Sequence, residues 1–306
     1  MFFNSEKVAF GRHETFPLRF SWLPKGFQAL EDNPKVFESD DVTVRLGVGR
    51  NMVNAIRYWL RASRMIAPDS FEPTQLGKLI LSSDGYDPYL EDEATIWLLH
   101  WLVASNAELA TAFYWFFNIF QKREFSTEEL NTALSDFLND VVPKNKRPAK
   151  NTVKSDAAVI QRMYTQSKIN QRMPLEEALD SPTALLKLVE HKTTEKMFVS
   201  RLTAKSSLPI EILGFATIEV MKSRKQNILP IEDLMYSREG FSAPGSVFRL
   251  SENSFIRKLE QLAQLMPGAF EIRESSGIHQ LFLLEDIEPI TLIENYYGGS
   301  KKEQAA

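Results

Sequence analysis

The most constraining feature of this 306-residue chain is that it contains no cysteine. Disulfide frameworks, thiolate zinc sites, iron–sulfur clusters and thiol catalysis are therefore excluded. The chain must instead be held together by an apolar core, and its 43% hydrophobic and 25% charged residues are typical of a globular protein. Two segments, Thr95–Ala104 and Leu109–Gln121, are apolar on nearly every side, which indicates helices buried at the centre of a domain.

The same apolar runs and the N-terminal residues favour a cytoplasmic protein. Residues Met1–Lys7 lack the basic start and the apolar stretch of about 7–15 residues that make a signal peptide. The longest uncharged apolar run, Leu109–Gln121, is well short of the roughly 20 residues that a membrane span needs. We therefore expect a soluble chain with no membrane partner.

Length and pattern together predict two mostly helical domains, at roughly 150 residues per domain. Strand signals are few and short, whereas Ser126–Glu129 is a capping box that opens a helix to about Leu138. The expected fold class is mainly α, with two winged helix-turn-helix-like modules joined by helical segments and few short strands. The expected N-terminal helical domain (1–142) contains a winged helix-turn-helix (about 42–82) and a buried helical hairpin (95–121). A basic linker (143–155) joins it to a C-terminal helical domain (156–297) that ends in a winged-helix module (about 229–285). A disordered tail (298–306) follows.

Charge is distributed unevenly along a chain whose net charge is only −4. From Val42 to Arg64 there are five arginines and no acid, and from Val142 to Ser155 there are five basic residues and again no acid. The overall charge argues against a protein that coats nucleic acid without selectivity. Basic faces on an acidic protein indicate contact with phosphates at chosen places.

The first of these basic runs has the pattern of a helix-turn-helix. Two glycines in Leu46–Gly49 allow a tight turn, and a helical period with one apolar face begins directly after it. A second helix whose outer face is basic is what a reader of the DNA major groove needs. The outer face carries a stripe formed by Arg50, Asn54, Arg57, Arg61 and Arg64.

An all-positive stripe is unusual for a helix that only faces solvent. Solvated faces usually mix signs, because acid–base pairs four residues apart support the helix. We therefore favour DNA contact over simple solvation, although both interpretations remain open. The DNA-binding residues predicted in this part of the chain are Arg19, Arg50, Asn51, Asn54, Arg57 and Arg61.

A second winged-helix pattern lies near the C-terminus. A short helix near Leu229–Met235 is followed by a helix over Ser251–Met266 and by two alternating segments around Ser275–Gly277, which predict a β-hairpin. Asn253, Arg257 and Lys258 are its candidate DNA-binding residues. Glu260 on the same helix would repel phosphate, so a protein-contact module is an equal alternative.

The best cluster for chemistry is Arg12-His13-Glu14, with Arg19 and Lys25 nearby. His13 would act as a general base, with Glu14 beside it, while Arg12 would stabilise a phosphate as charge builds up on it. Two alternatives stand beside this catalytic interpretation. The cluster contacts DNA without chemistry, or Glu14 and Arg19 form an ion pair that fixes the segment to the core.

Other polar motifs give weaker signals. Asp180 followed by Glu190-His191-Lys192 has the outline of one nuclease fold, but the apolar residues before it indicate a helix where that fold needs a strand. The acidic run Asp84–Glu93 is a candidate cation site, but a cap on the following helix explains it more simply. His100 lies in an apolar helix and is expected to be a core histidine. The glycines of Leu46–Gly49 do not form a phosphate-binding P-loop, because no Gly-Lys-Ser/Thr follows.

With these motifs in view, the chain resembles the DUF4007 family. The resemblance is dense in four segments, Gly11–Gly26, Leu46–Val53, Asp87–Asp92 and Trp97–Leu102, and it is diffuse after about residue 200. It implies a bacterial defence function, because members of the family are similar to the nicking component of systems that place sulfur in the DNA backbone (phosphorothioation).

That resemblance also implies partners and an activity. The partners would be double-stranded DNA, a cysteine desulfurase, an ATP-pyrophosphatase-like protein and an ATPase. The activity would be DNA nicking that opens the site for modification, with Mg²⁺ or Mn²⁺ as the metal if the reaction needs one and metal ligands unassigned. The alternative is a non-catalytic winged-helix adaptor or a regulator of the operon. A chain without cysteine cannot carry persulfide sulfur itself, which agrees with a DNA-handling function.

Overall fold

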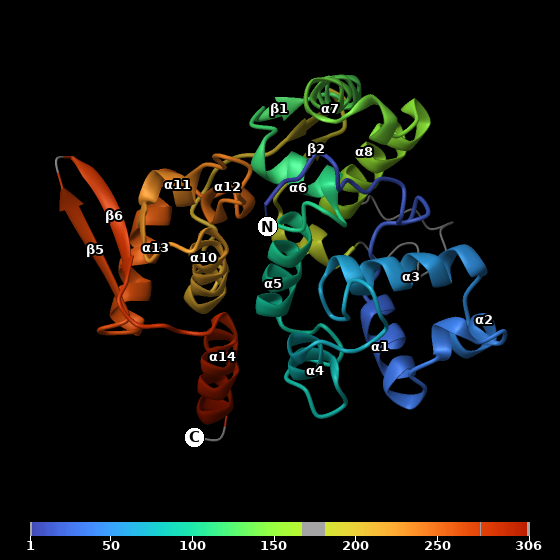
Figure 1. Cartoon of the computed structure of the whole chain (residues 1–306), viewed down its shortest axis with the longest axis horizontal. Helices are drawn as coiled ribbons and strands as arrows, with labels where there is room; N and C mark the ends of the chain where they lie inside the picture. The colour runs from blue at the N-terminus through green and yellow to red at the C-terminus, as the bar shows by residue number, and fades with distance from the viewer. Residues whose placement is uncertain (1, 167–180, 276, 305–306) are drawn as a thin grey trace. The chain divides into compact units, whose positions relative to one another are not determined.

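The computed structural model describes residues 2–166, 181–275 and 277–304, and it is mainly α-helical with a few short strands, as the sequence predicts (Figure 1). The described residues form two compact units. The first unit comprises residues 4–116 and 120–201. The second comprises the described residues before 4, residues 117–119 and those from 202 onward.

The first unit is built from eight helices, three 3-10 turns and one small sheet among its described residues. Its helices are α1 (Trp22–Asp32), α2 (Val42–Leu46), α3 (Arg50–Ala62), α4 (Gln75–Leu81), α5 (Glu93–Ala104), α6 (Thr111–Asn118, whose end belongs to the second unit), α7 (Thr127–Val141) and α8 (Lys150–Tyr164). Its 3-10 turns are η1 (Val36–Glu38), η2 (Lys144–Lys146) and η3 (Pro182–Leu186). Strands β1 (Glu124–Phe125), β3 (Met197–Val199) and β2 (Glu190–Lys192) pair antiparallel in that order.

The two apolar segments found in the sequence form the centre of this unit. Helix α5 is buried from Ala94 to Ala104, and α6 is buried as far as Asn118. Trp97 and Trp101 on α5 are both inaccessible to solvent. The predicted capping box is confirmed, because Ser126 accepts from the Glu129 amide while Glu129 accepts from the Ser126 amide.

Residues 143–155 do not separate two units, and the division falls after Arg201 instead. The proline-bracketed segment forms η2 and the first turns of α8, and α8 packs against α7. Arg147 explains the difference: its guanidinium donates to the carbonyl oxygens of Val142 and Asn139 at the end of α7. The segment is thereby folded back onto the helix that precedes it.

The second unit contains helices α10 (Ile210–Arg224), α11 (Ile231–Met235), α12 (Pro244–Val247), α13 (Glu252–Leu265) and α14 (Pro289–Gln304). Strands β4 (Ile228–Pro230), β6 (Ile278–Leu283) and β5 (Phe270–Ser275) form an antiparallel sheet in that order. The predicted hairpin is therefore present as β5 and β6 (Figure 1). Helix α14 continues to Gln304, where the sequence predicts a disordered tail from residue 298, because its buried Leu292, Ile293 and Tyr297 pack it against α10.

Helix length and hydropathy bear on membrane insertion for the described part of the chain. None of them is both long enough and apolar enough to cross a membrane.

Candidate nucleic-acid interface

Helices α2 and α3 are joined by a tight turn in the first unit. Gly47 ends α2 in the left-handed conformation, with φ of 61°, and its amide donates to the carbonyl of Val44. Glycine adopts this conformation without the steric penalty that a side chain brings. Gly49 precedes α3 and supplies no side chain to cap it, so the first amides of α3 are left to outside partners. A short helix, a turn and a longer helix therefore follow in the predicted order.

The faces of α3 divide as its period predicts. Val53, Ile56 and Leu60 are buried on the inner side, and Trp59 is buried with them. Arg50 and Asn51 are exposed, and Asn54, Arg57 and Arg61 are half-buried. The helix contains no acid, so its outer face is entirely positive.

The basic side chains of α3 differ in their surroundings. Arg57 donates to Asn54 Oδ1 at 3.4 Å, which keeps both side chains on one side of the helix. The Arg61 guanidinium lies over the Phe71 ring at 5.0 Å, and burial followed by the charge of Arg57 lowers its pKa. Arg64 does not extend the stripe, because α3 ends at Ala62 and Arg64 bonds to Ser105 Oγ at 2.6 Å.

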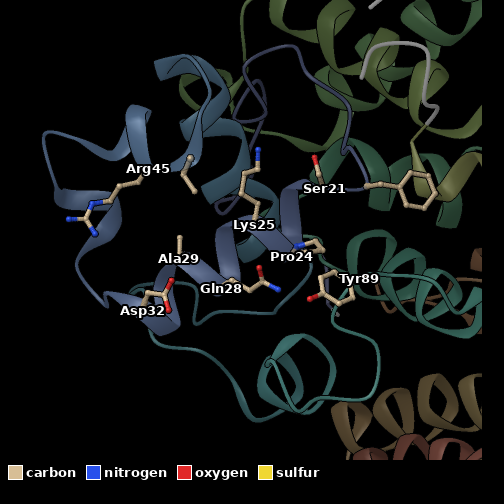
Figure 2. A pocket seen from close by; sticks show the side chains of 10 residues that line it. Ser21, Pro24, Lys25, Gln28, Ala29, Asp32, Arg45 and Tyr89 are labelled. Atoms are coloured by element: carbon tan, nitrogen blue, oxygen red, sulfur yellow. The ribbon is translucent and has the colours of Figure 1, made fainter. Parts of the chain in front are cut away.

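An open pocket lies beside the α2–α3 segment, between α1, α2 and the loop that holds Tyr89 (Figure 2). Lys25, Gln28 and Asp32 line it from successive turns of α1. Arg45 contributes from α2, where it also pairs with Asp41 at 2.8 Å. Gln28 and Asp32 do not stand out in the sequence, because polar residues at this spacing are ordinary on the outer face of a helix.

His13 is buried, with 1% of its surface exposed. Its Nδ1 accepts the amide of Thr15 at 3.1 Å, which places the ring proton on Nε2. Nε2 lies 3.1 Å from Asp156 Oδ1 on α8, although the approach is not aligned as a hydrogen bond. The other Asp156 oxygen accepts the amide of Gly11 at 2.9 Å. This environment fits a histidine that holds the N-terminal segment more closely than it fits a general base, and the catalytic assignment stays a prediction.

The neighbours of His13 are placed differently. Arg12 is exposed, whereas Glu14 is half-buried and adopts a left-handed φ of 50°. Arg19 lies over the ring of Trp22 at 5.2 Å and that of Phe16 at 5.9 Å. No ion pair between Glu14 and Arg19 is found in the described part of the chain, so His13 and Asp156 take the fixing function expected of that pair.

In the second unit, the candidate residues on α13 are separated by burial. Asn253 and Arg257 are exposed, and so is Glu260. Lys258 is only 9% exposed, and its ammonium donates to the carbonyl of Leu208 at 2.8 Å. Burial lowers its pKa. Lys258 is therefore directed into the unit rather than toward a phosphate, while the winged-helix interpretation of this region stays a prediction.

The Glu190-His191-Lys192 part of the nuclease outline forms a strand. The α-helix expected for the apolar residues before it is wrong, because they lie in a 3-10 turn and a short link. Residues Pro182–Leu186 form η3, and Glu190–Lys192 form β2. Asp180, the third member of the outline, lies outside the described residues. Glu190 and Lys192 point to one face of the small sheet, as residues two apart in a strand must, and Lys192 pairs with Glu124 at 3.5 Å. These contacts leave a structural ion pair as a sufficient explanation.

The remaining polar motifs behave as the simpler interpretations predict. Asp87 accepts the amides of Glu91 and Asp92, and Asp92 caps α5 by accepting the Ala94 amide. His100 is fully buried, and its Nδ1 lies 2.8 Å from the Tyr164 hydroxyl. Across the described ranges, no group of three or more histidines and acids is arranged to hold a metal ion. The expectation of Mg²⁺ or Mn²⁺ stays a prediction, with its ligands unassigned.

Known proteins resemble this chain over nearly its whole length. The model of a family described as "Protein of unknown function (DUF4007)" matches residues 10–297. Two solved structures, described as "Magnesium ion-bound SspB crystal structure" and "SspB crystal structure", each superpose with a TM-score of 0.83 and 28% sequence identity. Each match covers 96% of this chain and 90% of the solved one. No curated protein matches the sequence.

Proposed function

The chain belongs to the DUF4007 family, and we propose that it is a DNA-binding component of a DNA phosphorothioation system. The binding surface is the outer face of α3, with Arg50, Asn51, Asn54 and Arg57 as its contacts. A single observation carries this proposal: a tight turn is followed by an amphipathic helix whose outer side has basic and amide groups and no acid.

The chemistry of these side chains suits double-stranded DNA. Arginine pairs with the acceptor edge of guanine, and asparagine pairs with adenine, in the major groove. The open amides at the start of α3 attract anions, because the partial positive charge of the helix is concentrated there. Arg61 supports this surface rather than forming its centre, since its guanidinium is stacked on Phe71.

The assignment to a phosphorothioation system is supported by the family resemblance and by the structural neighbours named SspB. It supports partners of the kinds expected from the sequence: a cysteine desulfurase, an ATP-pyrophosphatase-like protein and an ATPase. Their attachment to this chain is part of the proposal.

DNA affinity as a function of salt tests the binding surface. We expect Arg57→Ala to weaken binding and to reduce the slope of log affinity against log salt by about one, the contribution of one phosphate contact. Arg50→Ala should act similarly, because Arg50 is exposed on the same helix. Arg238→Ala is the matched control in the second unit, since it removes an exposed arginine from a surface ion pair with Glu232. Unchanged affinity and slope in both α3 variants would rule out this surface.

Nicking is the finer activity that the resemblance implies, and a non-catalytic DNA-binding adaptor or operon regulator is the second candidate. The enclosed ring of His13 favours the adaptor, because both of its nitrogens face protein groups. Supercoiled plasmid incubated with Mg²⁺, Mn²⁺ or EDTA distinguishes the two candidates. Open circles formed by the wild type and lost in Arg12→Ala would assign nicking to the N-terminal cluster, whereas a gel shift without open circles would assign the adaptor.

A further inference from the structure

The 3-10 turn η2 and the start of α8 carry four exposed lysines, at positions 144, 146, 150 and 154. None of the four forms an ion pair or side-chain hydrogen bond with another described residue. The fifth basic residue, Arg147, is instead committed to the carbonyls at the end of α7. The fold therefore uses the arginine to hold the segment and leaves the lysines facing solvent.

Helix α8 continues this positive surface along its outer face. Lys150 and Lys154 lie one turn apart, and the exposed Arg162 follows two turns later. The single acid of the helix, Asp156, is only 3% exposed and faces His13. The outer face of α8 is consequently free of acids, as the outer face of α3 is.

The N-terminal segment Gly11–Phe16 links the two positive helices. It is bound to α8 by the Asp156 contacts with Gly11 and His13 and by the Arg162 side chain, which donates to the Thr15 carbonyl. It is bound to α3 by Trp59, whose Nε1 donates to the Phe16 carbonyl at 3.2 Å, and by the His13 ring, which stacks on Trp59. The exposed Arg12 lies in the middle of this link.

We propose that the lysine face of η2 and α8 is a second contact for the DNA backbone, joined through Arg12 to the surface of α3. The proposal rests on DNA binding by α3 and adds a site to it. His13 and Asp156 are positioning residues in this arrangement, since they hold Arg12 between the two helices without touching the ligand.

The residue types assign different tasks to the two helices. A lysine ammonium is a compact charge that neutralises phosphate without reading geometry, whereas arginine and asparagine form the paired bonds that distinguish bases. Contacts from α8 should therefore add affinity equally on every sequence. The exposed Asp136 and Asp140 on α7 oppose phosphate nearby, and the four lysines together outweigh them in charge.

The test is a full-length variant in which Lys144, Lys146, Lys150 and Lys154 are all changed to Gln. Its control changes four exposed lysines outside both surfaces, Lys35, Lys78, Lys196 and Lys225, so that net charge falls equally. The slope of log affinity against log salt is measured on two unrelated duplexes. We expect the slope to fall by about two to four in the α8 variant, at roughly 0.9 for each phosphate contact, and by less than about one in the control.

Two further observations decide the outcome. A variant with the same four lysines changed to Arg should keep the wild-type slope, which shows that charge at these positions is what matters. Equal slopes in the α8 variant and the control would overturn the α8 contact, and if Arg57→Ala still weakens binding, the proposed function stands without it. Absence of DNA binding by the wild type would overturn both.

Discussion

Replacing His13 by alanine separates a positioning histidine from a catalytic one. The buried ring joins the N-terminal segment to α8 through Asp156 and to α3 through Trp59. Its removal leaves the Asp156 carboxylate, which is 3% exposed, with the Gly11 amide as its remaining hydrogen-bond donor in the described structure. The structure therefore predicts that the substitution reduces the free energy of unfolding.

The magnitude follows from the burial of both partners. The ring carries its proton on Nε2 only, so the contact is not an ion pair, and leaving the buried carboxylate without this partner costs about 1–3 kcal/mol. The lost packing of the buried ring on Trp59 adds to this and brings His13→Ala to about 3 kcal/mol. For a unit of this size, that change lowers the midpoint of thermal unfolding by about 6–12 °C. Arg12→Ala, at an exposed position, should change stability by about 0.5 kcal/mol or less.

Thermal unfolding and plasmid nicking are measured on the same preparations of the two variants. We expect His13→Ala to unfold well below the wild type and Arg12→Ala to unfold with it. Asp156→Asn is the second arm, because the amide oxygen still accepts the Gly11 amide while the charge is removed. An unchanged unfolding midpoint in His13→Ala together with complete loss of nicking would refute the positioning function and restore His13 as a general base.

Two further predictions concern the second unit. Gly214→Ala should lower the free energy of unfolding, measured by chemical denaturation, by about 1 kcal/mol. The new Cβ would lie 2.7 Å from Leu262 Cδ1, and the cost of this overpacking exceeds the gain in helix propensity. Greater stability in the variant would contradict this packing. Lys258→Met should leave the salt slope of DNA binding unchanged, since the ammonium bonds to Leu208 inside the unit. Burial lowers the folded-state pKa of Lys258, so between that pKa and 10.5 the unfolded chain binds more protons and wild-type stability rises with pH; a variant with the same rise would refute this assignment.

Much of the helical fold was predictable because local patterns determine it. The apolar face of α3, the apolar residues around the whole of α5 and the capping box of α7 are set within a few residues of sequence. The residues before Glu190 were misassigned for a physical reason. The apolar run ends in the 3-10 turn η3 and a short irregular link, and the strand that follows is the polar β2, whose pairing with β3 is decided by contacts that the local sequence does not contain.

The boundary between the units and the state of His13 depended on contacts that composition does not reveal. The proline-bracketed segment has the composition of a linker, yet one arginine side chain attaches it to α7. The Arg12-His13-Glu14 cluster has the composition of a catalytic site. However, the carboxylate that faces His13 belongs to α8, far along the chain, where sequence shows only an isolated acid among lysines.

That isolated acid connects the stability of the unit to its surface charge. A helix with an all-positive outer face is destabilised by repulsion between its side chains, and paired acids on that face would be the ordinary remedy. In α8 the acid is turned inward to bind the N-terminal segment, so it stabilises the fold without neutralising the lysines. In α3 there is no acid at all. Both helices therefore keep a positive face that their own stability does not require, and a polyanion held across the two would supply the missing negative charge.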